Sequence, residues 1–217
     1  MTEDNQEVIK RAVTLIQDGM CKEAISVLEA HLEHYPESLE GWYNLGIALG
    51  DCEREEEAVK AYDEALAIDN EIFEIWFNKG TVLYELADFK SAKDCYAKAL
   101  EISPDDAEVW NNLGNCHSRL GDGRAAIEAY TRAVALKPDY AEAFYNKANA
   151  HFIEGEDEKA VAFAEVALQL DPALKKLVDQ WIHVALSRLE SARLEAEYRR
   201  RPKEEQRIIP PEEESKE

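Results

Sequence analysis

The chain has 217 residues, a net charge of −21 and a hydrophobic fraction of 46%, which is enough to build a buried core. The negative charge lies on residues 1–173, because residues 174–217 hold ten Lys and Arg and ten Asp and Glu. An acidic surface repels phosphate groups, so the composition argues against binding to nucleic acid or to an anionic membrane and favours a neutral or basic partner.

The chain is built from copies of a 34-residue unit, which we place at residues 5–38, 39–72, 73–106, 107–140 and 141–174. Each unit after the first carries a large aromatic anchor in the same register, and the first unit carries Val8 there. The anchors are Trp42, Trp76, Trp110 and Phe144. A fixed period of this length indicates a solenoid whose units bury their apolar faces against their neighbours.

Each unit is predicted to form two antiparallel helices, because apolar and small residues recur at the spacing of one helix face. In the fourth unit, Trp110 and Gly114 mark this face on the first helix, and Ala126, Tyr130 and Ala133 mark it on the second. The anchors are expected to be buried. Glycine residues are predicted to end several first helices, and these are Gly19, Gly121 and Gly155. Proline residues halt helix propagation between units, and these are Pro104, Pro138 and Pro172.

This pattern resembles the tetratricopeptide repeat (TPR) family, whose 34-residue motif has Trp, Leu-Gly, Tyr, Ala, Phe, Ala and Pro at fixed positions. The resemblance covers residues 5–174, with Lys79 and Lys147 where the family has Leu. It implies an all-α, right-handed superhelical α-solenoid of five TPR repeats. It also implies, in outline, a function in holding other proteins or peptides.

Residues 175–201 are predicted to form a capping helix with an apolar stripe that includes Val178, Trp181 and Ala185. The resemblance implies that this helix shields the last apolar face of the array. Its far end is basic, and it includes Arg199–Arg201. Residues 202–217 have no periodicity, three prolines and mostly charged side chains, so we predict a disordered charged tail.

Candidate binding residues lie on the first helix of each unit. An Asn stands two residues after each anchor and a Glu two residues before it, so the two share a helix face. The resemblance implies that this face lines a concave groove, where Asn amides can donate to and accept from a peptide backbone. The alternative is that these side chains only cap or pack. The expected groove residues are Asn44, Asn78, Asn112, Asn146, Asn115, Asn149, Tyr43, Phe77, Tyr145, Glu40, Glu74, Glu108 and Glu142.

These features predict a non-enzymatic scaffold that binds an extended neutral or basic peptide segment in the groove. No phosphate-binding loop, nucleophile elbow or HExxH motif is present, so no enzymatic activity is expected. The alternative is a structural protein that self-associates as a homodimer or higher oligomer through the groove or the C-terminal helix.

The cysteine pattern predicts neither a metal site nor a cofactor. Cys21, Cys52, Cys95 and Cys116 are far apart and form no CxxC pair, so we expect four reduced, packed thiols. The polar N-terminus lacks the apolar core of a signal peptide, and no segment reaches the roughly 18 apolar residues of a membrane span. Together these features predict a cytoplasmic location.

Overall fold

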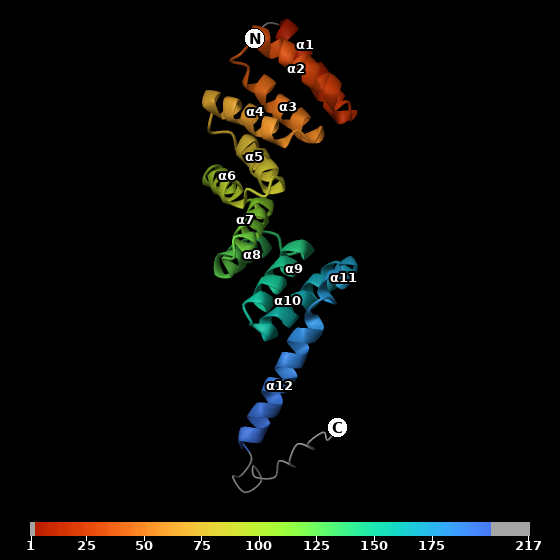
Figure 1. Ribbon diagram of the computed structural model, residues 1–217, viewed down its shortest axis with the longest axis vertical. Helices are drawn as coiled ribbons and strands as arrows, with labels where there is room; N and C mark the ends of the chain where they lie inside the picture. Colours follow the sequence, from red (N-terminus) through yellow and green to blue (C-terminus); the bar gives the residue numbers. More distant parts are fainter. Residues whose placement is uncertain (1–2, 201–217) are drawn as a thin grey trace, which may run out of the picture.

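The structure is a computed structural model that describes residues 3–200. Its regular elements within that range are all helical, and they follow one another along an elongated body (Figure 1). The predicted tail at 202–217 lies outside the described residues, as does Arg201 of the predicted basic end. The elements are α1 (Glu3–Gln17), α2 (Cys21–His34), α3 (Leu39–Asp51), α4 (Glu55–Ile68), α5 (Phe73–Glu85), α6 (Phe89–Ile102), α7 (Ala107–Arg119), α8 (Gly123–Leu136), α9 (Ala141–Ile153), α10 (Asp157–Leu170), the 3-10 turn η1 (Pro172–Leu174), α11 (Lys175–Val178) and α12 (Ile182–Arg200).

The helices recur with the period of the sequence. The starts of α3, α5, α7 and α9 are 34 residues apart, and so are those of α4, α6, α8 and α10. Each first helix packs against the second helix that follows it, and each second helix packs against the next first helix. The predicted all-α solenoid is therefore confirmed.

The turn between the two helices of a pair has one conformation throughout the array. Its left-handed residue falls every 34 positions, with φ values of 56° at Glu53 and 59° at Ala87 where the other pairs have Gly. In each turn the next backbone N–H donates to a carbonyl five residues earlier, as Arg54 does to Leu49 and Asp122 does to His117. This is the Schellman pattern that closes a helix C-terminus. The turn therefore forms even where Glu or Ala occupies the position that glycine favours.

Glycine on the first helix makes room for a buried tyrosine on the second. A Cβ atom at Gly114 would lie 2.5 Å from Cε1 of Tyr130, which is 2% exposed. The same arrangement pairs Gly46 with Tyr62 and Gly80 with Tyr96. In the last pair both positions are alanine, at 148 and 164, and both side chains are buried. A large tyrosine on the second helix is therefore matched by glycine on the first, and in the last pair two alanines take the same positions.

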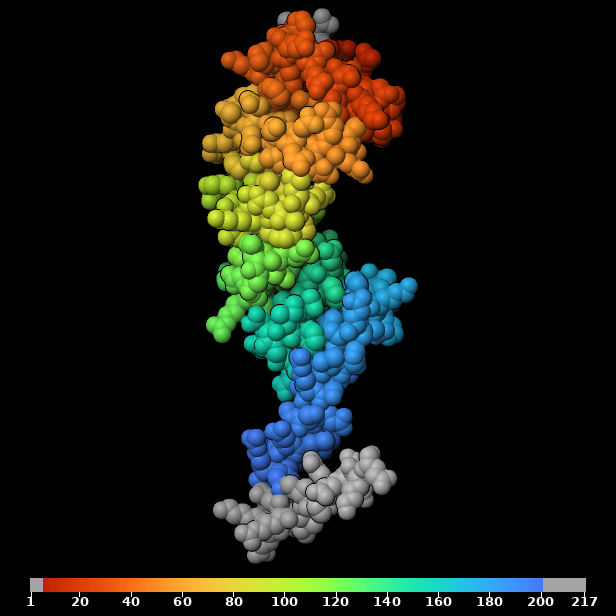
Figure 2. Space-filling model, in the orientation of Figure 1, coloured from red at the N-terminus to blue at the C-terminus, as the bar shows by residue number. Residues whose placement is uncertain are grey.

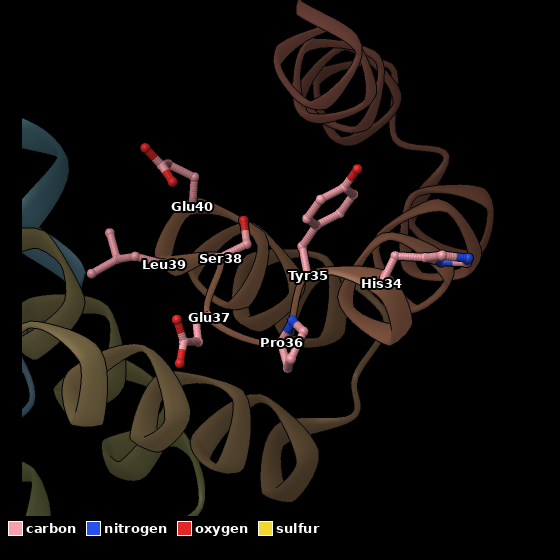
Figure 3. Close-up of a pocket in the computed structure, with 7 residues that line it drawn as sticks. All are labelled: His34, Tyr35, Pro36, Glu37, Ser38, Leu39 and Glu40. Atoms are coloured by element: carbon pink, nitrogen blue, oxygen red, sulfur yellow. The ribbon is translucent and has the colours of Figure 1, made fainter. Parts of the chain in front are cut away.

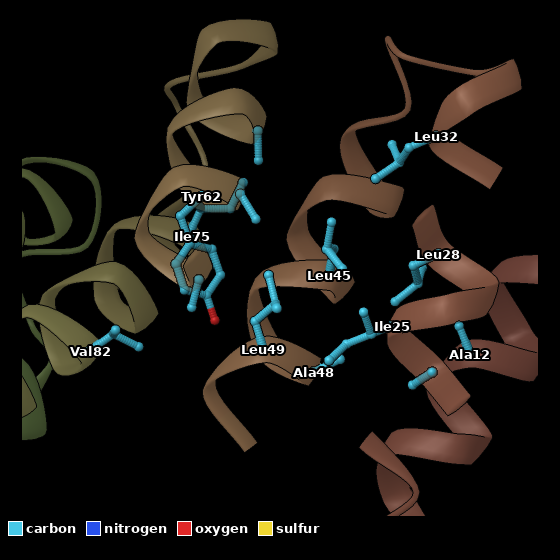
Figure 4. Close-up of a cluster of buried hydrophobic side chains, with 14 residues drawn as sticks. Ala12, Ile25, Leu28, Leu32, Leu45, Ala48, Leu49, Tyr62, Ile75 and Val82 are labelled. Carbon is cyan, nitrogen blue, oxygen red and sulfur yellow. The ribbon is translucent and has the colours of Figure 1, made fainter. Parts of the chain in front are cut away.

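The tryptophan anchors are only half-buried, which corrects the prediction that they are buried. The indole N–H of Trp42, Trp76 and Trp110 donates to the carbonyl oxygen six residues earlier, at 2.8 Å in each case. Residues just before the anchors, such as Ile75 and Val109, are the fully buried ones. The tryptophan anchors thus hold the loop that precedes each repeat through a hydrogen bond. The residues just before them lie in the core, part of which is shown in Figure 4.

The stretch predicted as a single capping helix forms two helices. A turn at 179–181 separates α11 from α12, and it places Val178, Trp181 and Ala185 in a buried cluster with Ala148 and Ala164. The second half of α12 extends beyond the body and is exposed (Figures 1 and 2). Two arginines of the basic end form ion pairs within this helix, Arg193 with Glu197 and Arg199 with Glu195.

The prediction of four reduced thiols was wrong for two of them. Cys21, at the start of α2, forms a disulfide with Cys52, which follows α3, and their Cα atoms are 5.8 Å apart. Cys95 and Cys116 are free and buried, and burial raises the pKa of their thiols to about 11 and about 12. The argument for a cytoplasmic location that rested on reduced thiols therefore does not apply to the first pair.

Reduction of this disulfide is expected to destabilise the N-terminal helices. The bond closes a loop with a sequence separation of 31, for which the chain-entropy estimate is about 3–4 kcal/mol. Thermal melting followed by circular dichroism, with and without dithiothreitol, measures this loss. The double variant Cys21→Ser/Cys52→Ser should melt alike in both conditions. A wild-type melting curve that dithiothreitol does not change would contradict the expectation.

Candidate functional site

The predicted groove residues lie on helices that line the inner side of the stack. Among the first helices of successive pairs, α1 contacts α3, α3 contacts α5 and α7 contacts α9, while α5 and α7 make at most isolated contacts. Within residues 3–200, the second helices make at most isolated contacts with one another. In a curved stack the more closely spaced helices lie on the concave side, so α3, α5, α7 and α9 form that side.

Three of the four Asn residues that follow the anchors use their amides inside the protein. Asn78 Nδ2 donates to Tyr43 Oη at 3.1 Å, and Asn146 Nδ2 donates to Asn111 Oδ1 at 3.0 Å. Both bonds connect neighbouring repeats at equivalent positions. Asn44 Nδ2 instead donates to the backbone carbonyl of Glu40 at 2.6 Å, within its own helix.

Asn112 differs because the residue at the accepting position one repeat earlier is Phe77, which has no hydrogen-bonding atom in its side chain. It is half-buried on α7, and its amide makes no hydrogen bond to any described residue.

Asn149 on α9 is the second of the expected groove Asn residues whose amide makes no hydrogen bond to a described residue. Its equivalent, Asn115, accepts from Tyr130 Oη at 2.8 Å and from Asn146 Nδ2 at 3.2 Å. At Asn149 the tyrosine is absent, because Ala164 occupies that position. The concave side thus offers two unbonded amides, on neighbouring first helices.

The aromatic groove residues are half-buried, and two of them lie against buried tyrosines. The ring of Tyr43 lies 6.3 Å from that of Tyr62, and the ring of Phe77 lies 6.0 Å from that of Tyr96. Tyr145 is also half-buried, and burial raises the pKa of its hydroxyl. These rings offer part of each apolar face to a ligand.

Phe73 is a site residue that the sequence analysis missed. Its ring stacks on that of Phe77 at 6.0 Å with an interplanar angle of 11°. The signal was available, because aromatic residues four positions apart share a helix face. The two rings lie one turn apart on the same face of α5.

The four glutamates are exposed, and each lies in the first turn of its helix. Within the described residues, none of these carboxylates forms an ion pair with a Lys or Arg side chain. They are Glu40, Glu74, Glu108 and Glu142, and they give the concave side an acidic edge. Glu40 also lines a cavity of about 500 Å³ at residues 34–40, where it and Tyr35 project to the same side of the loop (Figure 3).

Two basic side chains of α9, the last of the concave helices, are buried. Burial lowers the pKa of Lys147, whose ammonium lies 4.0 Å from the centre of the Phe163 ring. Burial also lowers the pKa of His151, although a hydrogen bond of 2.6 Å from Nδ1 to Glu156 opposes that shift. Both side chains are buried, so neither is exposed to a ligand on the concave side.

No group of three His, Cys, Asp or Glu side chains among the described residues could hold a metal ion. None of the helices in that part of the chain is long and apolar enough to cross a membrane.

Comparison with known proteins identifies both repeats and fold. Tetratricopeptide repeat family models match residues 39–72, 71–139 and 117–174. No curated protein matches the sequence.

Among solved structures, MamA 41-end from Desulfovibrio magneticus RS-1 is 21% identical, with a TM-score of 0.75 over 80% of this chain and 98% of that one. YrrB, described as a TPR protein with an unusual peptide-binding site, is 23% identical, with a TM-score of 0.70 over 84% of this chain and 90% of that one. The family models together cover residues 39–174 and agree with the 34-residue recurrence of the helices, so this chain belongs to the tetratricopeptide repeat family.

Proposed function

We propose that this protein is a binding scaffold whose concave side, formed by α5, α7 and α9, holds an extended neutral or basic peptide segment. The observation that carries the proposal is the pair of unbonded, half-buried amides of Asn112 and Asn149. YrrB, which has the same fold, is described as having a peptide-binding site. The scaffold we propose binds its partner without converting it.

The amides explain why the ligand would be an extended chain. One Asn side chain can donate a hydrogen bond to a peptide carbonyl and accept one from a peptide N–H. An extended segment leaves these backbone groups unpaired and available. Two Asn side chains on neighbouring helices would therefore recognise backbone rather than a particular sequence.

The exposed carboxylates explain the preferred charge of the ligand. Glu74, Glu108 and Glu142 lie on the same helices as the amides, and the whole chain has a net charge of −21. Such a surface attracts basic segments and repels acidic ones, most strongly at low ionic strength.

The affinity is expected to be modest. If each amide contributes about 0.5–1.5 kcal/mol, the pair supplies about 1–3 kcal/mol, which is less than the cost of ordering a flexible peptide. The rings of Phe73 and Phe77 and the carboxylates would have to supply the rest.

The double variant Asn112→Ala/Asn149→Ala is expected to weaken peptide binding by about 5- to 150-fold, the equivalent of the two hydrogen bonds. The measurement is fluorescence anisotropy with labelled decapeptides that carry lysine, no charge or glutamate. Wild-type protein should prefer the lysine and uncharged peptides over the glutamate peptides.

Asn44→Ala is the matched control, because the amide of Asn44 is bonded within its own helix. It should keep wild-type affinity, and both variants should keep the wild-type melting temperature. Equal affinity of the wild type and the double variant for every peptide would reject the concave side as the site.

A further inference from the structure

The first repeat differs from the next three at its anchor, where Val8 replaces tryptophan. In the third repeat, Trp76 and Lys98 line two open cavities. Ile102 lines one of them, and Lys79 and Cys95 line the other. The second cavity is also lined by Val59 of α4, so side chains of α4, α5 and α6 surround it.

In the first repeat the corresponding space is one open cavity of about 430 Å³. Six of its eight lining residues are the counterparts, 68 positions earlier, of residues that line the cavities around Trp76, and the other two are His31 and Tyr35. The six include His34 in place of Ile102, Ala30 in place of Lys98 and Val27 in place of Cys95. We call this space the N-terminal recess, and its lining residues are Val8, Arg11, Ser26, Val27, Ala30, His31, His34 and Tyr35.

A basic residue, Arg11, lines the recess at the position where the third repeat has Lys79 beside its indole. The Lys79 ammonium lies 5.6 Å from the centre of the Trp76 ring, and Arg11 is the counterpart of Lys79. Arg11 is exposed and forms no ion pair within the described residues. An Arg side chain favours the face of an aromatic ring, and of tryptophan most of all. The recess therefore has a basic residue at the position of Lys79 but no indole at the position of Trp76.

The recess is open on one side, and it is lined by residues of α1 and α2 and by Tyr35, which follows α2. It shares the lining residues His34 and Tyr35 with the cavity of about 500 Å³ at residues 34–40 (Figure 3), so the two spaces are adjacent. Tyr35 is 42% exposed and offers an apolar surface between them. The backbone that carries an aromatic side chain into the recess could lie along this surface.

We propose that the N-terminal recess binds an aromatic side chain, preferentially tryptophan, that is presented by a helix of a partner protein. The aromatic group fits because later repeats place an indole among the equivalent residues. A helix fits because Val59 of α4 lines one of the equivalent cavities in the third repeat. The recess lies on α1 and α2, away from the Asn residues of α7 and α9, and does not depend on the function proposed above.

The test uses N-acetyl-L-tryptophanamide as the probe and the amide resonances of the full chain in nuclear magnetic resonance spectra. We expect saturable shifts at Val8, Val27 and Ala30 with an affinity in the millimolar range. Val8→Trp should fill the recess, abolish these shifts and raise the melting temperature by about 2–4 °C. Arg11→Ala should weaken binding by about 2- to 5-fold, as expected for loss of an exposed cation–π contact.

Lys10→Trp is the matched control, because it adds an indole to an exposed position of α1 outside the recess. It should neither block the probe nor stabilise the protein, and Asn112→Ala/Asn149→Ala should bind the probe normally. Absence of probe shifts in the wild type, or shifts that persist in Val8→Trp, would overturn the proposal. Sedimentation over a concentration series provides a second check, since a dimer that Val8→Trp abolishes would assign the recess to a second copy and also overturn it.

Discussion

Replacement of Tyr130 by Ala is expected to lower the free energy of unfolding by about 3–5 kcal/mol, the usual cost of removing a buried aromatic side chain. The Tyr130 side chain is 2% exposed and lies against Gly114, and its hydroxyl donates to Asn115 on the concave side. The variant would leave a cavity between α7 and α8 and remove the donor to Asn115. Urea denaturation monitored by circular dichroism measures the loss.

The partner glycine provides a control for this prediction. Gly114→Ala alone should cost about 1–3 kcal/mol, because the added methyl group would overlap the Tyr130 ring. The double variant Gly114→Ala/Tyr130→Ala reproduces the Ala148 and Ala164 pair of the last repeat, so it should cost less than the sum of the two single changes. Strict additivity would contradict the packing described for these positions.

Replacement of Trp181 by Ala is expected to cost about 3–5 kcal/mol and to expose the end of the array. The Trp181 ring is 6% exposed and stacks on Phe152 at 4.9 Å, and it covers the alanines of α9 and α10. Loss of the ring would expose an apolar face of the last repeat to water and promote association of molecules through that face. Thermal melting together with light scattering measures both effects.

Leu177→Ala is the matched control on the same cap, because Leu177 is 40% exposed. It should change the melting temperature little. Removal of residues 175–217 should reproduce the effect of Trp181→Ala, and removal of 203–217 should not. A soluble chain that ends at Leu174 and melts at the wild-type temperature would contradict the capping role.

The repeated helices could be predicted from the sequence because each repeat packs mainly against its neighbours. A 34-residue period therefore specifies local contacts that are the same in every copy, including the turns at Gly121 and Gly155. The period also indicated which face of each first helix carries Asn and Glu. It did not indicate that the tryptophan anchors are half-buried, because the indole N–H bonds to a loop carbonyl that the apolar pattern does not reveal.

The features that were not predicted depend on individual side chains in different repeats. Whether the Asn that follows an anchor bonds to the preceding repeat depends on the residue 35 positions earlier, which is Tyr43 for Asn78 and Phe77 for Asn112. The disulfide joins cysteines whose nearness follows from how α2 packs against α3, and their spacing gives no signal. The turn at 179–181 interrupts an apolar stripe that favours a continuous helix.

Site-specific crosslinking tests the proposed peptide-binding side most directly. The photoreactive residue p-benzoylphenylalanine would replace Phe77 on the concave side and, in a control protein, exposed Ala97 on α6. Each protein would be irradiated with a library of random decapeptides, and the adducts identified by mass spectrometry. The proposal predicts adducts at position 77 that are enriched in neutral and basic peptides and that decrease when Asn112 and Asn149 are replaced by Ala. Equal, unselective labelling at positions 77 and 97 would contradict it.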